Sequence, residues 1–186
     1  MSGHAIFYQW RSALAREGEP YQFRDAFTGF FRDKYSVPGV YRWRVMRTST
    51  NTKEPIYIGE AEDVVRRIQR VRTPSRKAKE VDTNKRLNAL FHSYLSAGNI
   101  IFLEIVDVES FELNGVRFGR DTMGDRFKRR MTENLLLAIE QKSGAYELLN
   151  ITIDPVQKAR KALEKLPPGE VRKLIRQYGL DKPTTV

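Results

Sequence analysis

The chain of 186 residues contains no cysteine and only two histidines, His4 and His92. The absence of cysteine excludes disulfides, thiolate zinc sites and a cysteine nucleophile. Two histidines are too few to build a histidine zinc or iron centre. A catalytic metal would therefore be held mainly by carboxylate oxygens, which favours Mg²⁺ or Mn²⁺.

Long apolar runs are also missing. No stretch approaches the roughly 20 apolar residues that a membrane-spanning helix requires, so we expect no membrane partner. Residues 1–10 lack the basic flank and the apolar run of a signal peptide. These absences predict a cytoplasmic protein.

The charge is strongly unbalanced, with 33 basic and 23 acidic side chains and a net charge of +10. Residues 61–90 carry nine basic but only four acidic side chains, and residues 155–183 carry eight basic and three acidic ones. Polyphosphate backbones release counterions to such surfaces, which makes nucleic acid the expected partner. The predicted contacts within the first segment are Arg66, Arg70, Arg72, Arg76, Lys77, Lys79, Lys85 and Arg86.

Hydrophobic periodicity predicts an α/β (α+β) fold, a small mixed β-sheet flanked by helices. Strands are expected at 40–46 and 55–59, joined as a hairpin, at 100–108 as a central strand, and in a small hairpin over 109–119. Helices are expected at 5–17, 22–34, 61–71, 83–97, 125–141, 155–166 and 169–178. We expect residues 73–80 to be a charged loop and 145–153 to be extended or irregular. The predicted organisation is an N-terminal helical extension over 1–36, a core over 37–153 and a basic C-terminal helical segment over 154–186.

Two short glycine–tyrosine motifs lie on the strands of the predicted hairpin. Gly39-Val40-Tyr41 is on the first strand and Tyr57-Ile58-Gly59 is on the second. Arg67 follows eight residues after Gly59, on the next predicted helix. Each triplet is uninformative alone, since tyrosine is common in hairpin strands.

The later part of the chain completes an ordered pattern. Glu133 lies in Thr132-Glu133-Asn134-Leu135 on the long helix, and Asn150 follows in Leu148-Leu149-Asn150. Over residues 37–151, the order of these motifs and the elements that carry them resemble the GIY-YIG endonucleases. The resemblance implies a GIY-YIG-like core that hydrolyses DNA phosphodiester bonds with Mg²⁺ or Mn²⁺; RNA is the alternative substrate.

The resemblance also implies a role for each residue in a single-metal mechanism. Tyr41 would be the general base, Tyr57 its partner or a phosphate contact, and Arg67 the phosphate clamp. Glu133 would be the metal ligand, and Asn150 would orient the site through its amide. A bound metal and nearby cations are expected to lower the pKa of the tyrosines.

Two positions depart from the family pattern. Glu60 stands where many relatives carry lysine or a small polar residue, and Val71 stands where many carry a histidine or tyrosine that assists the base. His92 is a candidate replacement for that helper, or else a histidine on the helix surface. Glu140 is an alternative to Glu133 as the ligand.

Other interpretations remain open. The chain is either a nuclease or a non-catalytic nucleic-acid-binding protein that retains the fold, and Val71 and Glu60 favour the second. A basic structural protein that recruits another protein is a third possibility. One active site cuts one strand, so double-strand cleavage would need a homodimer, two sequential nicks or a partner.

Overall fold

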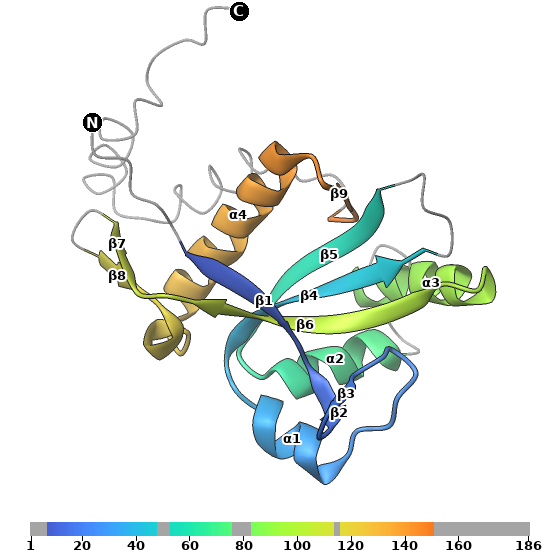
Figure 1. The fold of residues 1–186 in the computed structure, drawn as a ribbon. Coiled ribbons are helices and arrows are strands. Elements are labelled where there is room, and N and C mark those ends of the chain that lie inside the picture. Colours follow the sequence, from blue (N-terminus) through green and yellow to red (C-terminus); the bar gives the residue numbers. More distant parts are fainter. Residues whose placement is uncertain (1–6, 48–52, 76–82, 114–115, 151–186) are drawn as a thin grey trace, which may run out of the picture. The chain divides into compact units, whose positions relative to one another are not determined.

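Five strands form one mixed sheet in the order β1-β6-β4-β5-β9 (Figure 1). The computed structural model describes residues 7–47, 53–75, 83–113 and 116–150, which belong to one unit. All neighbouring strands of this sheet are antiparallel except the last pair. The strands are β1 (Tyr8–Ser12), β6 (Ile100–Val108), β4 (Gly39–Met46), β5 (Glu54–Ala61) and β9 (Tyr146–Leu148).

Helices cover both faces of the sheet (Figure 1). Because successive side chains of a strand point to opposite faces, β4 divides its residues between two cores. Tyr41 and Trp43 belong to the core that includes residues of α1 (Gly29–Tyr35), α2 (Val64–Arg72) and α3 (Thr83–Ser96). Val40 belongs to the other core, with Leu136 and Leu137 of α4 (Arg126–Ser143). The predicted mixed α/β class is confirmed.

Local signals account for where α2 and α4 begin and for where α4 ends. Asp63 caps α2 by accepting a hydrogen bond from the backbone N–H of Arg66 at 2.8 Å. Asp125 caps α4 by accepting from the N–H of Phe127 at 2.7 Å. Gly144 ends α4 in the left-handed conformation, with φ of 64°.

The N-terminal region differs from its prediction. The expected helix over 5–17 is wrong: β1 pairs with β6, and β2 (Leu14–Arg16) pairs with β3 (Glu19–Pro20). The backbone of β6 finds its hydrogen-bond partners in β1, and this tertiary pairing outweighs the helical spacing of the apolar residues. The expected helix over 22–34 is shortened to α1, which Thr28 caps. The described part of the predicted helical extension, residues 7–36, therefore supplies a strand to the main sheet and contains only the short helix α1.

Most other elements are confirmed to within a few residues. The β4–β5 hairpin, α2, α3, α4 and β6 lie where expected, and β6 is an interior strand. The small hairpin is formed by β7 (Phe111–Leu113) and β8 (Val116–Phe118), and a 3₁₀ turn, η1 (Arg120–Thr122), follows it. Both helices predicted after residue 154 lie outside the described residues, as does most of the loop over 73–80. Within the described ranges, no helix is both long and apolar enough to cross a membrane.

Candidate active site

The two glycine–tyrosine motifs meet directly across the β4–β5 hairpin. Tyr41 is paired with Gly59, and the next residue pair on the same face joins Trp43 to Tyr57. Tyr41 is fully buried and Tyr57 is 8% exposed. A Cβ on Gly59 would lie 2.7 Å from the Tyr41 hydroxyl and 2.9 Å from its Cζ. Glycine at this position therefore leaves the space in which the Tyr41 ring crosses the neighbouring strand.

Arg67 of α2 joins this pair. Its Nε donates a hydrogen bond to the Tyr41 hydroxyl at 3.1 Å, and its Nη1 donates to Oδ1 of Asn84 at 2.6 Å. A hydrogen bond with Tyr57 also contributes to the raised pKa of the arginine. The guanidinium is thus held between the sheet and the first turn of α3.

Burial controls the protonation of the tyrosines. Desolvation raises the pKa of Tyr41 well above its usual range; the neighbouring Tyr57 and Glu133 act in the same direction, and Arg67 opposes them. Desolvation likewise raises the pKa of Tyr57, with Arg67 opposing. In the protein alone the pKa values of both tyrosines are therefore raised and not lowered, because the loss of solvent outweighs one adjacent cation; the lowering by a bound metal stays a prediction.

Arg67 itself remains a cation. Burial lowers its pKa, but Tyr41 and Tyr57 raise it more, through charge and hydrogen bonding, so the net pKa shift is upward. A permanently charged fork beside two phenols is suited to bind phosphate oxygens.

Glu133 approaches this group from α4. It is 9% exposed, and its negative charge raises the pKa of both Tyr41 and Tyr57. Among the described residues, no group of three or more His, Asp or Glu side chains could hold a metal together. Mg²⁺ usually keeps several waters and binds through one or two carboxylates plus substrate phosphates. A single buried carboxylate near Tyr41 and Tyr57 could be the protein's ligand in a site of that kind.

Asn150 supports the second motif through the backbone. The backbone pairing of β9 with β5 reaches Leu148 opposite Ile56. The Asn150 side chain continues the pairing at Ile58: its Oδ1 accepts from the Ile58 N–H at 2.9 Å, and its Nδ2 donates to the Ile58 carbonyl at 2.6 Å. Ile58 lies between Tyr57 and Gly59, so Asn150 fixes the strand on which both stand.

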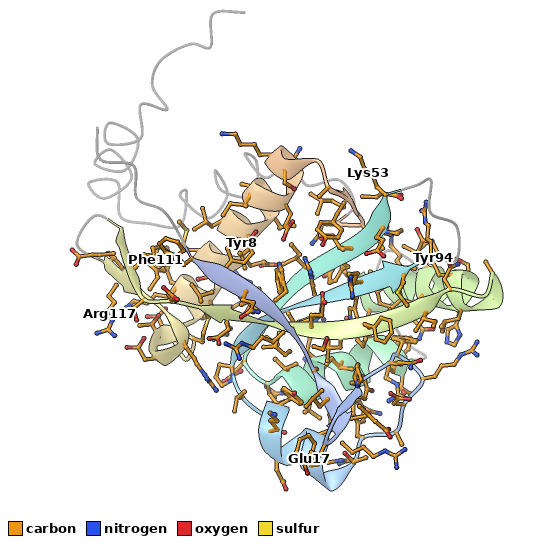
Figure 2. The ribbon with its side chains drawn as sticks, viewed as in Figure 1. Tyr8, Glu17, Lys53, Tyr94, Phe111 and Arg117 are labelled. Carbon is orange, nitrogen blue, oxygen red and sulfur yellow. The ribbon has the colours of Figure 1, made fainter. Side chains whose placement is uncertain are left out.

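Glu140, the alternative ligand, lies in a different environment. Its Oε1 accepts from Trp10 Nε1 at 2.8 Å, Arg42 Nη1 at 3.3 Å and the Tyr8 hydroxyl at 3.4 Å. Figure 2 shows Tyr8 between β1 and α4. Arg42 also pairs with Glu104, and the three charged residues are each 5% exposed. This buried ion-pair cluster is on the α4 face of β4, opposite Tyr41, so Glu140 lies apart from the group of Tyr41, Tyr57 and Arg67.

His92, the candidate replacement for the helper absent at Val71, lies on the surface of α3. It is exposed on α3 and its ring packs edge-on against Phe23, with 5.9 Å between the centroids. It is eight residues beyond Asn84, which corresponds to about 12 Å along the helix axis. Val71 is fully buried in the core between α2 and its neighbours. The structure instead brings Asn84 to Arg67, and no sequence motif singles out this asparagine.

Glu60 also has a structural explanation. Its Oε2 accepts from Nε of Arg129 at 2.7 Å, and its Oε1 accepts from Nε of Arg130 at 3.3 Å. Arg129 is 3% exposed and also donates to the carbonyl of Met123 at 2.7 Å. The acidic residue after the second motif therefore ties β5 to the start of α4, the helix that carries Glu133.

The predicted nucleic-acid contacts differ in their availability. Arg66 is exposed and pairs with Glu62 at 3.3 Å. The Arg72 side chain binds other residues of the protein. Its Nη1 donates to the Tyr21 hydroxyl at 2.8 Å, and its guanidinium lies 4.9 Å from the Phe27 ring centroid. Arg72 thus anchors the N-terminal segment, which removes it from the predicted contacts. Of the remaining residues, Arg70, Lys85 and Arg86 lie on α2 and α3, whereas Arg76, Lys77 and Lys79 lie outside the described residues.

Comparison of the chain with protein-family models, curated proteins and solved structures gives no match.

Proposed function

We propose that the protein is a divalent-metal-dependent endonuclease that hydrolyses DNA phosphodiester bonds, with a GIY-YIG-type active site. The observation that carries the proposal is the hydrogen-bonded group of Tyr41, Tyr57 and Arg67, which Glu133 influences from a fourth element. These residues come from β4, β5, α2 and α4. A tyrosine pair, a buried arginine and a carboxylate supply a proton acceptor, a phosphate clamp and a metal ligand.

Each residue takes one part in the reaction. Arg67 binds the scissile phosphate and compensates the charge that develops on it. Tyr41 accepts the proton of the attacking water, and Tyr57 shares the hydrogen bonds of Arg67. A Mg²⁺ or Mn²⁺ ion held by Glu133 would supply Lewis-acid stabilisation of the phosphate and the leaving oxygen.

The raised pKa of Tyr41 constrains this role. The phenol must lose its proton before it can accept one, and burial disfavours the phenolate. At neutral pH only a small fraction of the protein would carry the phenolate, so the cleavage rate should rise about tenfold per pH unit. Single-turnover rates between pH 6.5 and 9 would show that slope in the parent and lose it in Tyr41→Phe.

DNA as substrate is supported by the exposed basic residues near this group. Arg66, Arg70 and Arg86 are exposed on α2 and α3, the two helices that supply Arg67 and Asn84. Phosphate contacts from such side chains position the backbone without reading its sequence.

The test compares two adjacent arginines of α2. In Mg²⁺, with supercoiled plasmid and saturating enzyme, Arg67→Ala should lower the single-turnover rate by roughly a hundredfold or more, as expected for a lost transition-state donor. Arg66→Ala should weaken binding and reduce its salt dependence, with the rate at saturation retained. Nicked circles should precede linear DNA, since one site cuts one strand.

Two results would refute the proposal. Equal rates for the parent and Arg67→Ala would remove the arginine from the chemistry. A parent that binds DNA but cuts neither plasmid, duplex nor branched substrates with Mg²⁺ or Mn²⁺ would establish the non-catalytic binding protein instead.

A further inference from the structure

Asn84 is the side chain that holds Arg67 from outside the tyrosine pair. The bond between Arg67 Nη1 and Asn84 Oδ1 is 2.6 Å long, and the bond between Arg67 Nε and the Tyr41 hydroxyl is 3.1 Å long. A guanidinium is planar and rigid, so fixing Nε and Nη1 fixes the orientation of the whole group. Tyr41 and Asn84 together therefore decide where the arginine points.

The position of Asn84 in the fold makes this contact more than a surface hydrogen bond. It lies in the first turn of α3, whose Leu87 and Phe91 are buried in the core. It therefore stands on a rigid element, separate from both the hairpin and α2. The residues immediately before α3 belong to the basic segment predicted to contact nucleic acid.

The chemistry of an amide suits the task. A neutral carbonyl oxygen orients the guanidinium without cancelling its charge, whereas a carboxylate at the same position would neutralise it. We propose that Asn84 is a positioning residue that orients Arg67 toward the scissile phosphate and leaves its full positive charge for the transition state. This inference rests on the proposed nuclease function and names a residue that the sequence motifs do not include.

Asn88 offers a matched control. It lies one helical turn further along α3, and its Nδ2 donates to the backbone carbonyl of Arg72 at 3.0 Å. Both asparagines thus make a hydrogen bond from α3 to α2, but only Asn84 contacts Arg67. Any loss caused merely by weaker packing of α3 against α2 would be shared by Asn84→Ala and Asn88→Ala.

The experiment measures single-turnover cleavage at saturating full-length enzyme. Asn84→Ala should cut roughly ten- to a hundredfold more slowly than the parent, the cost of a misplaced catalytic group, and Asn88→Ala should stay within about threefold. Asn84→Asp should also be slow, because it keeps an acceptor oxygen but neutralises Arg67; a merely structural hydrogen bond would be restored by that substitution. The double variant Arg67→Ala/Asn84→Ala should cut no more slowly than Arg67→Ala alone, because Asn84 acts through the arginine.

A second readout does not depend on cleavage. In ¹⁵N-labelled protein, the Nε–Hε signal of Arg67 should shift and broaden in Asn84→Ala and remain unchanged in Asn88→Ala. If the parent cuts DNA and Asn84→Ala cuts within threefold of it, the inference is overturned while the nuclease function stands. If the parent cuts nothing, the proposed function and the catalytic purpose of Asn84 fail together, whatever the signal of Arg67 shows.

Discussion

The two motif glycines offer the sharpest test of the site geometry. Gly39 and Gly59 occupy equivalent positions in the two sequence motifs, but their surroundings in the structure differ. A Cβ on Gly59 would meet the Tyr41 hydroxyl at 2.7 Å. A Cβ on Gly39 would meet only Cγ2 of Val64, at an ordinary 3.6 Å. We therefore expect Gly59→Ala and Gly39→Ala to have opposite effects on stability.

The magnitude follows from the distances. The Tyr41 oxygen must move by about 0.7 Å to restore a contact of 3.4 Å with the new methyl group. That displacement is large enough to stretch the 3.1 Å bond from Arg67 beyond hydrogen-bonding distance. Tyr41 is fully buried, so its ring has no solvent to move into. Overpacking of this kind costs about 1–3 kcal/mol of the free energy of unfolding.

Gly39→Ala should behave differently, because alanine reduces the entropy of the unfolded chain without a clash. Where the backbone permits it, such a change stabilises a protein by about 0.4–1 kcal/mol. Urea unfolding followed by tryptophan fluorescence would measure both variants, and single-turnover cleavage would measure the displacement of Tyr41. Gly59→Ala should lose most of its cleavage rate, and Gly39→Ala should keep it. Equal stability of the two variants, with parental cleavage by Gly59→Ala, would show that Tyr41 does not lie over Gly59.

Three further predictions follow from the buried charges and phenols. Glu133→Gln should retain DNA binding but lose cleavage in Mg²⁺ or Mn²⁺. Glu140→Gln should instead lower the free energy of unfolding by about 3 kcal/mol, because it leaves Arg42 short of a buried partner. A stable Glu140→Gln variant that does not cut DNA would reverse the ligand assignment. Arg72→Ala should lower the urea midpoint and leave the salt slope of DNA binding unchanged, and a reduced slope would return Arg72 to the phosphate contacts. Burial raises the pKa of Tyr21 to about 12 and that of Tyr41 further. A phenol whose pKa is raised by folding contributes its full share to the free energy of unfolding below pH 10, and this share is lost as the pH rises through the folded pKa. The urea midpoint should therefore fall above pH 10. Parallel absorbance at 295 nm should show the bulk of these phenols ionising above pH 10 together with unfolding, and normal titration of every tyrosine in the folded protein would contradict their burial.

Local patterns in the sequence predicted the part of the fold that local forces decide. The alternation of Val40, Tyr41 and Trp43 marked β4, and the spacing of Val64, Ile68 and Val71 marked α2. The pattern of α2 describes which face of that helix is buried, and the same face is buried in the structure, whereas β4 contributes side chains to both cores. The motif order likewise placed Tyr41, Tyr57 and Arg67 on adjacent elements, where the structure joins them.

The N-terminal strand could not be predicted in the same way. The spacing of Trp10, Ala13 and Leu14 suits a helix, but the region pairs with β6, which lies almost a hundred residues later in the chain. Trp10 is partly buried as a residue of β1, where it packs against the core on the α4 side and donates to Glu140. Strand pairing is a non-local choice, since the hydrogen-bond partner belongs to another part of the sequence.

The arginines of α2 also separate what the sequence determines from what the tertiary structure determines. Arg67 and Arg72 stand five residues apart on one helix, and the sequence alone offers both as phosphate ligands. The sequence determined their charge and their helix, and through the motif pattern it singled out Arg67. Only the tertiary structure decided that Arg67 contacts Tyr41 and Asn84, while Arg72 contacts Tyr21 in the N-terminal segment. The physical reason is that a flexible cationic side chain takes its partner from whatever segment packs against its helix, and that packing is a property of the whole fold.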